Sequence, residues 1–118
     1  MTTYQSATAF DTAEKRAVSR HRVLLGAKLV YGGHAFTPEC MIRNLTDRGC
    51  SVRIAPGLQL PPVVSLIDMG AGHAYGAHVV WQRNGFAGLA FTSVRDLNTS
   101  GAGDPLRRLW VDALPRGR

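Results

Sequence analysis

The chain has 118 residues, of which 45% are hydrophobic, and 14 Lys plus Arg against 8 Asp plus Glu give it a formal net charge of +6. This length suits one ordinary domain with one modest core and is too short for a second domain of typical size. No apolar run approaches the about 20 residues that span a bilayer, and the N-terminus lacks the basic start and apolar stretch of a secretory signal, which predicts a cytoplasmic protein.

Short strands dominate the predicted secondary structure. Residues 1–13 are polar and aperiodic, which indicates a mobile lead-in. After them, apolar and polar residues alternate with the period of a β-strand, and Gly, Pro and Asn-Gly pairs interrupt the alternation as turns do. Strands are therefore expected over residues 23–31, 36–44, 50–54, 63–67, 74–82 and 85–92.

The last part of the chain predicts one helix. Residues 99–103 are rich in Gly and Ser and are expected to form a flexible linker, and Asp104 followed by Pro105 is a typical helix start. Beyond it, apolar residues recur at helical spacing until Pro115 ends the pattern, and they are Leu106, Leu109, Trp110, Ala113 and Leu114. This stripe predicts a helix face packed on the rest of the protein, with docking to a partner as the alternative.

The spacing of the strands determines the predicted architecture. Six closely spaced strands with tight turns leave no room for crossover helices, which favours an antiparallel sheet. Closing that sheet into a barrel removes its exposed edges, and the terminal helix is expected to cover an open end. We therefore predict an all-β fold, a six-stranded antiparallel β-barrel over residues 14–98, followed over residues 99–118 by the linker and a C-terminal α-helix packed on the barrel.

Two polar clusters interrupt the apolar pattern. The first precedes the first predicted strand and contains Lys15, Arg16 and Arg20. Guanidinium groups bind phosphates and guanine edges well because their planar donors engage two acceptors at once. Arg16 and Arg20 are close enough along the chain to hold one anion between them. A solvated basic leader without a ligand is the alternative.

The second cluster is Asn44-Leu45-Thr46-Asp47-Arg48-Gly49, at the junction of the second and third predicted strands. Asn44 offers an amide with a donor and an acceptor, Thr46 offers a hydroxyl, and Gly49 leaves room for a ligand or permits positive φ. The same residue types serve a hairpin turn for its own hydrogen bonds, so a purely structural turn is the alternative.

Taken as a pair, the clusters resemble the signature of PilZ domains. That signature is an Arg-x-x-x-Arg before a first strand and an Asn/Asp-x-Ser-x-x-Gly turn after a second strand. The matching residues here are Arg16, Arg20, Asn44, Thr46 and Gly49, and the resemblance extends over roughly residues 14–92. It implies a six-stranded barrel that receives the bacterial second messenger cyclic di-GMP.

The resemblance also implies a role for each matching residue. Arg16 and Arg20 hold phosphates and guanine edges, Asn44 and Thr46 form hydrogen bonds with a guanine, and Gly49 keeps the turn clear. Lys15 adds a phosphate contact or influences whether one or two ligand molecules stack. The departure from the family is Thr46, where Ser is usual, because its extra methyl group restricts χ1 while the hydroxyl is kept.

Cys40 and Cys50 flank the polar turn. If the two strands pair around Asp47, Cys40 lies opposite about Ile54, and Cys50 is displaced along the ladder by roughly 13 Å. We therefore predict two small apolar core residues and no disulfide, with a reactive thiol as the alternative.

The remaining residues predict no enzyme and no metal site. The four histidines lack zinc-like spacing, and no nucleophile with its base or carboxylate pair stands out. Trp81 is expected to pack in the core or at its rim, and stacking on a ligand is the alternative. No cofactor is expected beyond the ligand itself.

These observations favour a non-enzymatic cyclic di-GMP receptor. Ligand binding orders residues 14–22 against the barrel, and an unidentified protein effector recognises the changed surface. One alternative is a PilZ-like protein-interaction module that needs no ligand. Another is a small basic barrel that binds nucleic acid, which is less favoured because most aromatic residues fall on predicted core faces. No membrane partner is expected.

Overall fold

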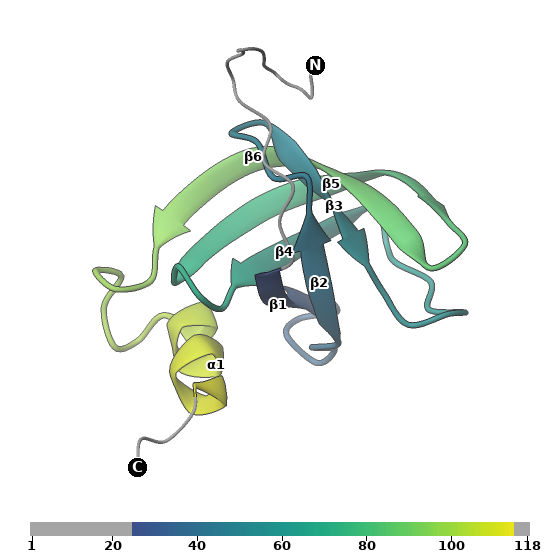
Figure 1. Ribbon diagram of the computed structural model, residues 1–118. Coiled ribbons are helices and arrows are strands. Elements are labelled where there is room, and N and C mark those ends of the chain that lie inside the picture. Colours follow the sequence, from purple (N-terminus) through teal and green to yellow (C-terminus); the bar gives the residue numbers. More distant parts are fainter. Residues whose placement is uncertain (1–24, 115–118) are drawn as a thin grey trace.

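Six antiparallel strands close into a barrel in the computed structural model, which describes residues 25–114 (Figure 1). In chain order the elements are β1 (Leu25–Val30), β2 (Glu39–Arg43), β3 (Gly49–Arg53), β4 (Val63–Asp68), β5 (His73–Arg83), β6 (Phe86–Asp96) and α1 (Pro105–Ala113). Neighbouring strands follow the order β1-β2-β3-β6-β5-β4, and β4 pairs with β1 to close the barrel. The predicted architecture of a six-stranded antiparallel barrel followed by one helix is confirmed.

The barrel interior is built by alternation along each strand. In β2, Cys40 and Ile42 are buried, and in β3 the buried residues are Cys50 and Val52. Met41 pairs with Arg53, and this register places Cys40 level with Ile54, as predicted. Both cysteines are free and buried, so the prediction of two core thiols without a disulfide is confirmed.

The hairpin between β5 and β6 follows directly from Asn84-Gly85. These residues have φ values of 54° and 80°, the left-handed backbone that a two-residue turn between twisted strands requires. Arg83 pairs with Phe86 across the turn. Both strands are 11 residues long, and β6 continues beyond its predicted end to Asp96, which pairs with His73. The extension was missed because residues 93–96 lack regular alternation of apolar and polar side chains.

Helix α1 packs on the outside of the barrel wall. Leu106 is buried in a second apolar cluster with Val30 of β1 and Ile67 of β4, and this cluster is separate from the barrel interior. Trp110 also belongs to it, and its Nε1 donates a hydrogen bond of 2.9 Å to the carbonyl oxygen of Met69. The helix thus covers outward-facing apolar side chains of β1 and β4, and Ala113 and Leu114 at its end line a pocket that also includes Ala27, Cys40 and Ile54 of the barrel. Within residues 25–114 no helix is long and apolar enough to cross a membrane.

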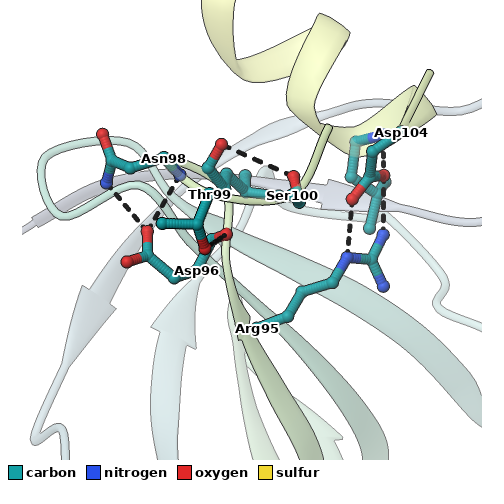
Figure 2. Close-up of polar contacts among 8 residues, drawn as sticks. Arg95, Asp96, Asn98, Thr99, Ser100 and Asp104 are labelled. Atoms are coloured by element: carbon teal, nitrogen blue, oxygen red, sulfur yellow. Dashed lines mark hydrogen bonds and ion pairs between the residues drawn. The ribbon is translucent and has the colours of Figure 1, made fainter. Parts of the chain in front are cut away.

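Asp104 fixes the start of α1, as its position before Pro105 predicts. Its carboxylate accepts a hydrogen bond of 3.0 Å from the backbone N–H of Leu106. Figure 2 shows the same carboxylate facing Arg95 of β6, with two donor–acceptor distances of 2.7 and 2.8 Å. The hydrogen bond from Arg95 lowers the pKa of Asp104 to about 2. The connection between β6 and α1 is therefore tied to the end of the strand, and Thr99 and Ser100 add side-chain hydrogen bonds to Asp96 and Leu97.

Candidate functional site

The turn between β2 and β3 uses the hydroxyl of Thr46 for its own structure. Thr46 Oγ1 accepts hydrogen bonds from the backbone N–H groups of Arg48 (3.1 Å) and Gly49 (3.2 Å). It also donates to the carbonyl oxygen of Gly49 at 3.1 Å. A hydroxyl has one proton and two lone pairs, so these three bonds occupy its full capacity. The turn by itself therefore accounts for a hydroxyl residue at this position.

Gly49 is required by the packing of the barrel. A Cβ atom added there would lie 2.1 Å from the carbonyl oxygen of Leu89 on β6, far inside the contact distance of these atoms. Next to this contact, the backbone N–H of Phe91 donates to the carbonyl of Arg48 at 2.8 Å. The close approach of β3 and β6 thus explains the glycine whether or not a ligand binds.

Asn44 presents its side chain on the outer surface of the barrel. Its φ of 53° lies in the left-handed region, which asparagine tolerates better than most residues. Its Nδ2 lies 3.5 Å from the hydroxyl oxygen of Ser51 on β3, which it contacts as a donor. That hydroxyl in turn donates to the carbonyl of Arg43 at 3.3 Å. Ser51 thus holds the amide of Asn44 over the start of β3.

A group of arginines and aromatic residues lies on the same outer surface. We call it the arginine–aromatic face, and it consists of Arg43, Arg53, Arg83, Trp81 and Phe86. Strand register assembles it, because Arg43 pairs with Ser51, Ser51 with Gly88, and Gly88 with Trp81. The neighbouring row pairs Arg53 with Phe86 and Phe86 with Arg83. Four adjacent strands therefore contribute to a continuous surface.

Cations and rings contact one another on this face. The guanidinium carbon of Arg43 lies 5.2 Å from the ring centroid of Phe86, and that of Arg83 lies 5.6 Å from the ring centroid of Trp81. Among the described residues, neither these two arginines nor Arg53 forms an ion pair. Such a surface can bind a negatively charged ligand and stack on its flat rings.

The described residues include only the second of the two predicted clusters. Asn44, Thr46 and Gly49 lie in one turn, whereas Lys15, Arg16 and Arg20 lie outside the described residues. Sequence reasoning missed Arg43, Arg83 and Phe86 as site candidates. Arg43 and Phe86 alternate with residues that face the barrel interior, which is the signal that could have placed them on the outer surface.

The two buried thiols have no part in this site. Burial raises the pKa of the Cys40 thiol to about 12, and burial likewise raises that of the Cys50 thiol. Both thiols therefore stay protonated and unreactive near neutral pH. In residues 25–114, no group of three or more His, Cys, Asp or Glu side chains could hold a metal ion.

Comparisons with models of protein families, with curated proteins and with solved structures found no match to this chain. The chemistry available at the site is therefore that of its own residues. Those residues combine an amide, cationic planar groups and an exposed indole on one face of the barrel.

Proposed function

We propose that this barrel is a non-enzymatic receptor for cyclic di-GMP. The observation on which the proposal rests is that Asn44 contacts Ser51 on the outer surface that also carries Arg43, Arg83 and Trp81. A cyclic dinucleotide has two phosphates and two flat purines, so it needs cations, hydrogen-bonding edges and stacking surfaces together. The arginine–aromatic face and the adjoining turn offer all three. Many anionic nucleotides would satisfy these requirements, and the resemblance of the two polar clusters to PilZ domains is the reason for choosing cyclic di-GMP among them.

Each residue of the two clusters has a role in this proposal. Arg16 and Arg20, with Lys15 beside them, supply phosphate and guanine-edge contacts from the segment that precedes β1. Asn44 forms hydrogen bonds with a guanine through its amide. Thr46 contributes by holding the turn in shape, because a direct bond to guanine requires it to give up one of its present partners. Gly49 keeps β3 close to β6 beneath the ligand.

Signalling follows from a difference between the free and bound arrangements. In the bound arrangement the ligand bridges residues 14–22 to Asn44, and a protein effector recognises the new surface. Such a switch works only as far as the ligand binds the bridged arrangement more tightly than the unbridged one.

Isothermal titration of cyclic di-GMP tests the proposal. We expect a dissociation constant in the micromolar range or below, which corresponds to roughly 8 kcal/mol or more. Arg16→Ala and Arg20→Ala each remove a charge-assisted hydrogen bond and should weaken binding by about tenfold or more. Asn44→Gly removes the amide and keeps the left-handed backbone, so it is a cleaner change than Asn44→Ala.

Arg108→Ala is the matched control. Arg108 is exposed on α1, and its replacement by alanine lowers the net charge by the same amount as Arg16→Ala or Arg20→Ala does. Binding by this variant should equal that of the wild type. Equal affinity in Arg16→Ala, Arg20→Ala and Asn44→Gly would remove the site assignment, and absence of heat with the wild type would remove the ligand.

Two observations favour other functions. The saturated hydroxyl of Thr46 favours a protein-interaction barrel that needs no ligand, which predicts no heat in the titration. The exposed indole of Trp81 beside Arg83 favours a binder of single-stranded nucleic acid. That function predicts salt-dependent binding of a generic oligonucleotide without competition from cyclic di-GMP.

A further inference from the structure

A β-bulge turns Trp81 to the outside of the barrel. Val79 pairs with Leu89 and Trp81 pairs with Gly88, so two steps along β5 match one step along β6 and Val80 is the extra residue. Val79 packs against the barrel core, and strict alternation would place Trp81 on the same inner face. Instead the side chain of Trp81 is 43% exposed. The irregularity therefore creates an exposed aromatic group at the expense of a core one.

Gly88 provides the space in which the indole lies. A Cβ atom added at Gly88 would be 2.1 Å from Nε1 of Trp81 and within 2.7 Å of two ring carbons. The pyrrole ring thus occupies the position that any side chain at residue 88 would need. The indole is supported by the backbone of β6, and the guanidinium carbon of Arg83 lies over the ring, 5.6 Å from its centroid. A ring held in place in this way loses little conformational entropy when a ligand stacks on it.

The register puts this ring next to the Asn44 turn. Ser51, which contacts the amide of Asn44, pairs directly with Gly88. Adjacent strands are about 4.8 Å apart, so an indole over Gly88 lies about one strand spacing from Ser51. That separation is within the dimensions of a two-ring purine.

We infer that Trp81 is a specificity-determining binding residue that stacks on a purine base of the ligand while Asn44 engages the edge of a base. Arg83, whose guanidinium lies over the indole in the structure, moves aside for the base and then offers a planar cation next to the stack. The inference rests on the proposed function and goes beyond it, because it assigns base recognition to β5 and β6, outside both polar clusters. It also explains the bulge at Val80 and the glycine at position 88 together, because both are needed to place the indole on the outer surface.

Titration of three variants tests the inference. Stacking of a base on an aromatic side chain contributes to the binding free energy, and its loss in Trp81→Ala should weaken cyclic di-GMP binding by about 5-fold to 100-fold. Trp81→Phe keeps a flat ring and should weaken binding far less than Trp81→Ala. Trp110→Phe is the control, because Trp110 packs in the separate cluster under α1 and should leave binding unchanged.

Fluorescence gives an independent measurement. The chain contains two tryptophans, so in the Trp110→Phe variant all tryptophan emission comes from Trp81. Cyclic di-GMP should quench this emission with the same midpoint as the calorimetric titration. The readout does not depend on whether Trp81→Ala folds.

The possible failures are distinguishable. Loss of binding in Asn44→Gly with full binding in Trp81→Ala and no quenching overturns the role of Trp81 and leaves the receptor function standing. Absence of any binding by the wild type overturns both. Quenching by a single-stranded oligonucleotide but not by cyclic di-GMP also overturns the inference, because Trp81 would then serve a different class of ligand.

Discussion

Replacement of Gly49 by alanine should destabilise the barrel in the absence of any ligand. The added Cβ would sit 2.1 Å from the carbonyl oxygen of Leu89, and the obstacle is backbone, which cannot rotate away as a flexible side chain can. β3 and β6 must separate locally, and the 2.8 Å hydrogen bond from Phe91 to Arg48 lies within the strained region. Overpacking of this kind costs about 1–3 kcal/mol, and a weakened hydrogen bond adds about 1 kcal/mol. We expect a total loss of about 2–4 kcal/mol.

Urea unfolding followed by circular dichroism measures this loss. With an m-value of about 1–3 kcal/mol/M, the midpoint should fall by about 0.7–4 M. Gly26→Ala is the matched control, because no atom lies within 4 Å of its ideal Cβ and its backbone is not left-handed. Its free energy of unfolding should change by less than about 0.5 kcal/mol. Equal midpoints for the two variants would refute the argument from close strand approach and return Gly49 to a role in ligand binding alone.

Three further changes test the interactions described above. Thr46→Val should cost about 1–3 kcal/mol because it leaves two backbone N–H groups of the turn without their acceptor, whereas Thr46→Ser should retain most of the stability; equal thermal midpoints in all three proteins would contradict this. The low pKa of Asp104 means that its carboxylate stabilises the fold above the unfolded pKa of about 4 and that this contribution disappears as pH falls through about 2. Urea unfolding at several pH values should show about 1 kcal/mol of such loss in the wild type, a modest value because Arg95 is half-exposed and partly screened. The loss should be smaller in Asp104→Asn, and identical pH profiles for the two proteins would rule out the ion pair as a contributor. Cys40 and Cys50 should react with a thiol reagent at pH 8 only after unfolding, and rapid labelling of the native protein would show that they are not buried.

Local sequence was sufficient to predict the structure wherever a short stretch of chain determines its own conformation. Asn84-Gly85 specified a two-residue hairpin because both positions need positive φ, and Asp104 before Pro105 specified the start of α1 because a carboxylate can accept from the first free N–H groups. Alternation of apolar residues predicted which side chains of β2 and β3 face the interior. With short turns between closely spaced strands, the same alternation was enough to predict the antiparallel barrel.

Contacts between residues distant along the chain decided the features that local sequence did not predict. The bulge at Val80 adds one residue to β5 without a distinctive local pattern, and only its pairing with β6 turns Trp81 outward. The need for Gly49 comes from a carbonyl 40 residues later in the chain, at Leu89, and the position of α1 follows from which wall of the barrel had uncovered apolar side chains. Sequence alone therefore determined the strands, turns and caps, because these depend on near neighbours. Tertiary structure decided which side chains from four different strands share one surface, because register is set by contacts between residues that are distant along the chain.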